Sequence, residues 1–315
     1  MAAGESVGIF GAAGAVGSAV AFALAHSGVA GRLVLADAAA TALARQHMDL
    51  EALTPALPGL AVEIGGVEAL ASCPVVVACA SVAHRDGEPR MAFLDENARI
   101  LSELAGGLAA AGWHGSVVLV SNPVDVLATR LQHALGEQRA CVIGCSLNDS
   151  LRLRVAIACC LGCAAADVDA WSVGEHGPHA VPLLSRVRVG GVRVALTADQ
   201  RARVEADVRG FYDRWQALGT GRTTVWSTAW GVATLVRALL RGDARPWPAS
   251  ALLHGEYGVE GICLTAPLLF RGGRGAPRVL EWRLAQREAD AVAVAAEVVR
   301  AAARATTEEA RCASC

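Results

Sequence analysis

Short apolar runs alternate with helical stretches through the first half of the chain. The runs Val7–Phe10 and Val75–Cys79 are continuously apolar, and the second is rich in β-branched residues. Such strands between helices are typical of a parallel sheet that is covered on both faces. The pattern predicts strands at 7–10, 32–36, 62–64, 74–79, 117–120 and 140–143, and helices at 14–26, 41–53 and 93–111. We therefore expect a doubly wound α/β domain.

The pattern changes after Gly144, where strands become shorter and less continuously apolar. It predicts helices at 150–161, 198–217, 228–241 and 282–303, and strands at 168–173, 181–189, 193–196 and in a pair between 250 and 264. The dipeptide Gly190-Gly191 favours a hairpin. We predict two domains, residues 1–143 and an α+β domain over residues 144–315.

Composition excludes several function classes. Hydrophobic residues make up 54% of the chain, enough for a sizeable core, and the formal net charge of −2 favours neither nucleic acid nor an anionic membrane as a partner. All 28 basic residues are arginine. Without lysine, Schiff-base chemistry and a phosphate-loop lysine are excluded.

The beginning of the chain, MAAGES, carries no basic residue and runs into an apolar strand, so we expect no signal peptide and a cytoplasmic location. The ten cysteines are scattered and are predicted to be reduced thiols. Cys312 and Cys315 have CxxC spacing, but two thiols alone make a weak metal site, and we expect no metal.

A glycine-rich turn follows the first strand. Gly11, Gly14 and Gly17 lie between strand and helix, and Asp37 ends the second strand 20 residues after Gly17. Glycines allow the backbone to approach a pyrophosphate, and the helix N-terminus supplies N–H donors. The carboxylate of Asp37 accepts hydrogen bonds from ribose hydroxyls and repels a 2′-phosphate. We therefore expect a Rossmann-type domain that binds NAD rather than NADP.

Two segments of the second half carry groups suited to proton and carboxylate chemistry. His176 lies between glycines after a strand, and near pH 7 it can exchange the proton that accompanies a hydride. Asp149 and Arg152 share one face at the start of a helix. We interpret Asp149 as the partner of His176 and Arg152 as a bidentate clamp for a substrate carboxylate. Taken alone, a histidine in such a position is more often structural, and Asp149 and Arg152 are more often a surface ion pair.

A polar loop follows the fourth strand, at the carboxyl end of the sheet where ligands bind. It contains His84, Arg85 and Arg90. Such a loop can close over a substrate and bring Arg90 to a carbonyl oxygen as negative charge develops there. Taken alone, the segment is more simply a solvated charged loop.

Together these segments resemble the lactate/malate dehydrogenase family. The resemblance runs along nearly the whole chain and rests on GAAGAVG, Asp37, Gly87–Arg90, Asn97, Ser121–Asp125, Asp149–Arg152, Gly174–Gly177, Val181-Pro182, Gly255–Gly258 and Leu264–Pro267. It implies that His176 is the acid/base, Asp149 its partner, Arg152 the carboxylate clamp and Arg90 the group that polarises the carbonyl. It also implies that Asn122 lies near the nicotinamide ribose and the substrate oxygen, that Asn97 belongs to the cofactor site, and that the protein is a homodimer or homotetramer.

The residues that would select the substrate depart from the family pattern. Six positions before Arg90, where lactate enzymes resemble each other in carrying glutamine and malate enzymes in carrying arginine, this chain has His84 followed by Arg85. Arg222 lies in the segment that lines the other side of the substrate. This polar set favours malate/oxaloacetate or a longer hydroxylated acid. Whether His84 or Arg85 reads the substrate side chain stays open.

Three function classes follow from these observations. The first is an NAD-dependent 2-hydroxy acid dehydrogenase, malate-like or alternatively lactate-like. The second is an NAD-dependent glycosidase of related fold, against which Arg152 and the GEHG segment argue. The third is an inactive NAD-binding protein, which the presence of His176, Asp149 and Arg90 disfavours.

Overall fold

The computed structural model describes residues 5–82, 93–137, 140–219, 223–272 and 275–312. The strands of the first half are β1 (Glu5–Phe10), β2 (Ala30–Ala36), β3 (Ala61–Ile64), β4 (Val75–Ala78), β5 (Gly115–Leu119) and β6 (Ala140–Gly144). They pair in parallel in the order β3-β2-β1-β4-β5-β6. The order reverses between β1 and β4, which confirms the expected doubly wound sheet.

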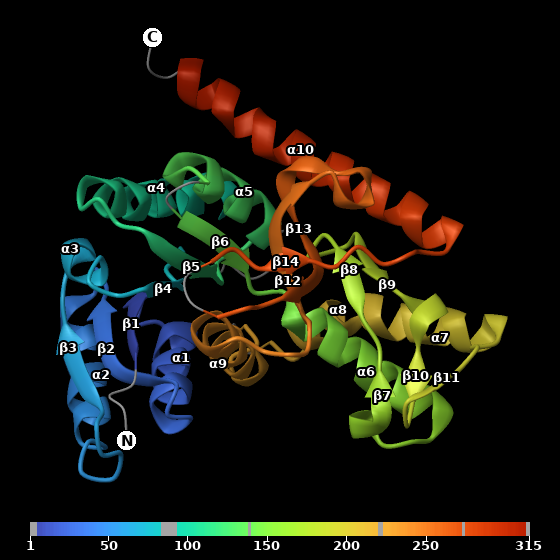
Figure 1. Cartoon of the computed structure of the whole chain (residues 1–315), viewed down its shortest axis with the longest axis horizontal. Coiled ribbons are helices and arrows are strands. Elements are labelled where there is room, and N and C mark those ends of the chain that lie inside the picture. Colours follow the sequence, from blue (N-terminus) through green and yellow to red (C-terminus); the bar gives the residue numbers. More distant parts are fainter. Residues whose placement is uncertain (1–4, 83–92, 138–139, 220–222, 273–274, 313–315) are drawn as a thin grey trace.

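Helices cover both faces of this sheet. The helices of the first half are α1 (Ala15–His26), α2 (Ala40–Glu51), α3 (Val67–Leu70), α4 (Leu94–Ala110) and α5 (Val124–Leu135). Helices α4 and α5 pack against each other on one face, while α1 packs against α9 (Trp226–Arg241) on the other (Figure 1). Fully buried strands between two helical layers explain the continuously apolar runs of the sequence.

The second half extends the same sheet. Its elements are α6 (Leu147–Leu161), β7 (Val168–Asp169), β8 (Ser172–Gly174), β9 (Ala180–Pro182), β10 (Arg188–Val189), β11 (Val192–Arg193), α7 (Ala198–Arg209), α8 (Phe211–Ala217), α9, β12 (Trp247–His254), β13 (Glu260–Leu269), β14 (Arg278–Val279) and α10 (Gln286–Cys312). Strand β12 pairs antiparallel with β6, and β13, β8 and β9 follow in order, while β14 pairs with β13. A separate small sheet contains β11, β10 and β7, so the expected hairpin at Gly190-Gly191 is present.

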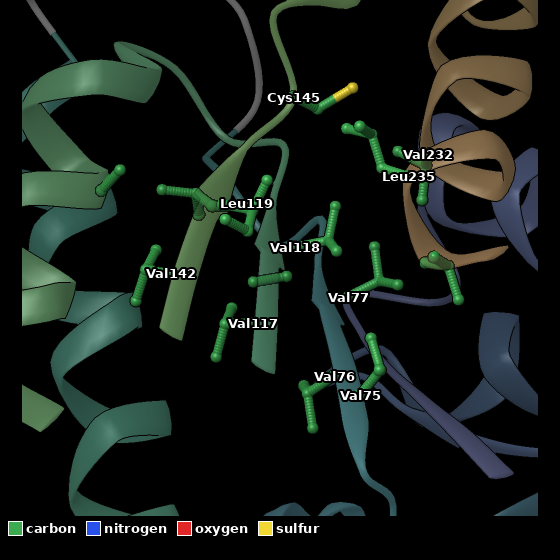
Figure 2. Packing of buried hydrophobic residues seen from close by; sticks show 14 of the residues in the cluster. Val75, Val76, Val77, Val117, Val118, Leu119, Val142, Cys145, Val232 and Leu235 are labelled. Atoms are coloured by element: carbon green, nitrogen blue, oxygen red, sulfur yellow. The ribbon is translucent and has the colours of Figure 1, made fainter. Parts of the chain in front are cut away.

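The core lies between the central strands and the helices on either side. Val77 and Val118 point toward Val232 and Leu235 of α9, as Figure 2 shows. All four side chains are completely buried. Burial of an aliphatic side chain of this size stabilises a fold by about 1.5–3 kcal/mol. This packing fixes the carboxyl ends of β4 and β5 against α9.

Several elements differ from the pattern-based expectation; for example, α3 and β14 were not predicted, and the expected strand over 168–173 is the two strands β7 and β8. Helix α5 was not expected; it packs against α4, β13 and α10, and even its polar residues Asp125, Thr129 and Gln132 are buried. The expected helix over 198–217 is two helices that divide at Gly210, and the expected strand over 181–189 is interrupted by a 3₁₀ turn at Leu184–Arg186. In the part of the chain that the structure describes, helices that combine the length and apolarity of a membrane span are absent.

Candidate active site

The turn after β1 is shaped by glycines with different neighbours. Gly11 has a positive φ of 87°, and a Cβ there would collide with the backbone of Ala80; a Cβ on Gly17 would collide with the carbonyl of Gly11. Gly14 precedes α1, and a Cβ added there would meet only the Gly11 carbonyl oxygen, at an ordinary contact distance of 3.6 Å. Contacts within the described protein therefore explain Gly11 and Gly17 but not Gly14, whose open side suits a close-lying phosphate.

Asp37 follows β2 and lies beside this turn. Its two carboxylate oxygens accept hydrogen bonds from the backbone N–H groups of Ala13 and Ala39, each at 2.9 Å. A carboxylate has about four lone-pair positions, so acceptor capacity is left for ribose hydroxyls. The structure thus brings Asp37 to the glycine turn, as its spacing predicts.

Two asparagines connect the loops that follow β4 and β5. Asn97 of α4 is buried; its Oδ1 accepts from the Val82 N–H at 2.9 Å, and its Nδ2 donates to the Asn122 carbonyl at 2.8 Å. The Oδ1 atom of Asn122 is buried and has no hydrogen-bond partner among the described residues. An unpaired buried amide oxygen is costly, and a hydroxyl of a bound ligand would satisfy it.

The proton-transfer candidate lies in the turn after β8. His176 is 8% exposed, and its Nδ1 lies 2.5 Å from Asp149 Oδ2. Because an ionised carboxylate only accepts, Nδ1 carries the hydrogen of this bond. The opposite ring nitrogen, Nε2, is then the atom that can exchange a proton with a substrate. The structure brings together the pair that the sequence predicted.

Asp149 also contacts the predicted carboxylate clamp. Its Oδ1 lies 3.5 Å from Nη1 of Arg152, and both side chains are mostly buried. Nη2 of Arg152 donates to the Thr224 hydroxyl at 3.4 Å, and the guanidinium lies 4.2 Å above the centre of the Phe211 ring. A stacked and hydrogen-bonded guanidinium loses little further entropy when it binds a carboxylate.

A polar chain continues from Arg152 into the interface of α6 and α9. The Thr228 hydroxyl donates to the Thr224 carbonyl at 2.8 Å and accepts from Asn148 Nδ2 at 3.0 Å. These contacts, and Phe211, were not predicted. The threonines carry no sequence signal of their own, and Phe211 of α8 lies far from Arg152 in the sequence.

Asp125 was also missed as a functional candidate. Its Oδ2 accepts a hydrogen bond from the backbone N–H of His176 at 2.5 Å. Burial raises the pKa of this carboxyl to about 7. The residue stood within a quoted motif, but the sequence alone did not show that its side chain reaches the histidine turn.

Four predicted residues cannot be placed. His84, Arg85 and Arg90 fall within 83–92 and Arg222 within 220–222, which lie outside the described residues. In the ranges that are described, groups of three or more His, Cys, Asp or Glu suited to hold a metal ion are absent.

Comparison with known proteins matches both halves of the chain. The family model for the lactate/malate dehydrogenase NAD binding domain matches residues 5–144, and that for the alpha/beta C-terminal domain of the same family matches residues 147–310. An L-lactate dehydrogenase of Limosilactobacillus reuteri is 31% identical over 91% of this chain and 90% of its own length. A malate dehydrogenase of Halobacterium salinarum is 32% identical over 94% of this chain and 97% of its own.

A solved structure agrees with these relatives. The lactate dehydrogenase of Cryptosporidium parvum, complexed with lactic acid and nicotinamide adenine dinucleotide, superposes with a TM-score of 0.87 at 25% identity, covering 96% of this chain and 98% of that one. The Cryptosporidium parvum malate dehydrogenase has the same fold, with a TM-score of 0.85.

Proposed function

Because the chain belongs to the lactate/malate dehydrogenase family and is an NAD-dependent 2-hydroxy acid dehydrogenase, we propose that it interconverts malate and oxaloacetate, or a closely related polar acid, with His176 as its proton-transfer residue. The observation that carries the proposal is the row formed by His176, Asp149 and Arg152. One carboxylate contacts both the imidazole and the guanidinium. This places a proton donor and an anion clamp beside each other, as the reduction of a 2-oxo acid requires.

The residues at the sheet edge fit the cofactor. Gly14, Asp37 and the unpaired Asn122 Oδ1 would hold NAD through its pyrophosphate, adenosine ribose and nicotinamide ribose, and Asn97 would support the last of these through the Asn122 backbone. When bound, NAD supplies or accepts the hydride at carbon 2 of the substrate.

His176 moves the proton that balances the hydride. In reduction its Nε2 donates a proton to the carbonyl oxygen of the 2-oxo acid, and in oxidation it removes the proton of the hydroxyl. Asp149 holds the Nδ1–H tautomer and stabilises the imidazolium that exists in one half of the cycle. Arg152 binds the carboxylate at carbon 1 and orients the neighbouring carbon.

The preference for a polar acid rests on residue types. If His84, Arg85 and Arg222 contact the substrate, as the family resemblance implies, they would give it polar or cationic surroundings. Among the described residues, the buried Asn148 and Thr228 and the half-buried Thr224 add polar groups next to Arg152. An unpaired buried charge costs several kcal/mol, so such surroundings disfavour a purely aliphatic substituent. Arg90 would polarise the carbonyl oxygen. A lactate-like preference is the alternative, since relatives of both kinds are about equally similar.

We further propose a homodimer or homotetramer in the cytoplasm, with domains 1–143 and 144–315. Large apolar side chains support association, because Met48, Leu218 and Trp226 are each at least 70% exposed. Eight of the cysteines, those from Cys73 to Cys263, are free thiols, which fits a reducing compartment. Light scattering of the purified protein measures the oligomeric state, and a monomer would contradict it.

A panel of 2-oxo acids tests the substrate proposal. Purified protein is mixed with NADH and oxaloacetate, pyruvate, 2-oxobutyrate or a hydroxylated 2-oxo acid, and the loss of NADH absorbance is followed beside parallel reactions with NADPH. We expect the highest kcat/KM with oxaloacetate or the hydroxylated acid, and NADH preferred over NADPH. A higher kcat/KM with pyruvate would overturn the polar-acid proposal, and no turnover with any acid despite NADH binding would overturn the dehydrogenase role.

A further inference from the structure

The carboxylate of Asp125 reaches the proton-transfer histidine from a different direction than Asp149 does. Asp125 is the second residue of α5 and is 2% exposed. Its Oδ2 accepts the backbone N–H of His176, whereas Asp149, from the first turn of α6, binds the ring. Two carboxylates from two helices therefore hold one residue, by its main chain and by its side chain.

The histidine turn needs such anchoring. His176 lies between Gly174, which has a φ of 85°, and Gly177, and glycines permit many backbone conformations. Small changes in this backbone would swing the imidazole by more than the tolerance of proton transfer, which is a few tenths of an ångström. The bond to Asp125 selects one position of the turn.

The same bond links the histidine to the cofactor side of the site. Helix α5 begins directly after Asn122-Pro123, and Asn122 is in turn held by Asn97 through its backbone carbonyl. Asp125 therefore joins the turn that carries the proposed proton donor to the turn that carries a proposed cofactor residue. The first turn would supply the proton, and the second would hold the cofactor that supplies the hydride.

Asp125 is also ionisable, whereas a neutral acceptor would be enough for a hydrogen bond with a structural role only. Its Oδ1 has no hydrogen-bond partner of ordinary geometry among the described residues. Burial raises its pKa to about 7, and this is only partly offset by the Ser250 hydroxyl, the His176 N–H and the His176 charge, while Glu175 opposes ionisation. Cys263 of β13 also faces it. When Asp125 is ionised, its carboxylate and a charged His176 attract each other.

We infer that Asp125 is a positioning residue for proton transfer, which fixes the backbone of His176 relative to Asn122 and, when ionised, places a negative charge close to the histidine. The inference rests on the proposed function, because it takes His176 to be the proton-transfer group. It adds a residue whose effect is exerted through His176 rather than by contact with the substrate.

Kinetics of two variants test the inference. Asp125→Asn keeps an oxygen that accepts the His176 N–H but removes the charge, and Asp125→Ala removes both. We expect kcat for oxo-acid reduction to fall about tenfold in Asp125→Asn and about 100-fold in Asp125→Ala, with the dissociation constant of NADH changed less than about twofold. Asp95→Asn is the matched control, since Asp95 is the exposed second residue of α4, and it should behave as the unmodified protein.

The pH profile separates positioning from a general effect on folding. Burial raises the pKa of Asp125 to about 7, so its ionisation should contribute a change in kcat/KM around that pH. Asp125→Asn cannot ionise there and should lack this change, whereas a merely structural role would leave the pH profile unaltered. Active sites are counted by titration with NADH, so that rates refer to folded enzyme only.

Each outcome distinguishes the inference from the proposed function. If the unmodified protein reduces 2-oxo acids and His176→Asn does not, while both Asp125 variants keep the unmodified kcat per active site and pH profile, the positioning role is refuted alone. A reduced number of active sites with normal kcat would also refute it. If the unmodified protein reduces no 2-oxo acid, or if His176→Asn is as active as it, the proposed function itself fails.

Discussion

Replacing Asp125 by asparagine should make the free energy of unfolding less dependent on pH. The carboxyl of Asp125 has an ordinary pKa of 3.8 in the unfolded chain and a pKa of about 7 in the fold, because burial disfavours its charged form. The folded protein therefore binds a proton that the unfolded chain has already lost between these two values. Stability must fall as pH rises from about 4 to about 7, and it levels off above that.

The size of the effect follows from the same two values. The full difference corresponds to about 4 kcal/mol, since each pKa unit is worth about 1.4 kcal/mol. Between pH 5 and pH 8 about 2 to 3 kcal/mol of this remains, because the unfolded carboxyl is already largely ionised at pH 5. Relative to the unmodified protein, Asp125→Asn should gain that amount of stability on going from pH 5 to pH 8.

Urea unfolding at the two pH values measures this difference. Both proteins are unfolded at one protomer concentration, because association would otherwise shift the midpoints. The difference in free energy of unfolding between the two proteins cancels the contributions of the other titrating groups, which both proteins share. Asp95→Asn serves as the control, because it removes an exposed carboxyl in place of a buried one.

A difference that stays constant from pH 5 to pH 8 would refute the reasoning, since it would mean that Asp125 ionises in the fold as readily as in the unfolded chain. A difference of opposite sign would show that His176 and the N-terminus of α5 stabilise the carboxylate more than burial destabilises it.

Three further predictions concern binding and specificity. Arg152→Lys should lower kcat/KM for the 2-oxo acid by about 100-fold through loss of bidentate binding, whereas Arg154→Lys on the same helix should change it less than about threefold; equal effects would contradict the clamp. Gly14→Ala should weaken NADH binding by about tenfold without lowering the melting temperature, whereas Gly17→Ala should lower the melting temperature by several degrees. Calorimetry measures the melting temperature and fluorescence titration measures NADH affinity. An unchanged NADH affinity in Gly14→Ala would refute the phosphate site. His84→Gln should shift preference toward pyruvate in the 2-oxo-acid panel, and an unchanged ranking would show that another residue reads the substrate side chain.

Much of the first half could be predicted, because its signals are local. The glycine turn, Asp37 at a strand end and the apolar strands each follow from a few neighbouring residues. Helix α5 was missed although Asp125, Thr129 and Gln132 recur at helical spacing, and no local signal shows that this polar face is itself buried. The division of α7 from α8 was missed because one glycine within a helical pattern does not always end a helix.

The candidate site, too, could be predicted from the sequence only in part. His176, Asp149 and Arg152 could be named because each residue type suits one step of the chemistry, and the structure brings them within hydrogen-bond or ion-pair distance. Phe211 and Asp125 could not be named as their neighbours, since both contacts join positions more than 50 residues apart. Such contacts depend on how helices pack against the sheet, which no local pattern encodes.

Proton transfer by His176 is the central claim, and a single-turnover measurement on His176→Asn tests it most directly. Enzyme saturated with NADH is mixed rapidly with the best 2-oxo acid of the panel, and the loss of NADH absorbance is followed. His114→Asn is the control, because His114 is exposed just before β5, at the opposite end of that strand from Asn122. We predict that His176→Asn binds NADH with unchanged affinity and transfers hydride at least about 1,000-fold more slowly, while His114→Asn matches the unmodified rate. Hydride transfer by His176→Asn at the unmodified rate would contradict the claim.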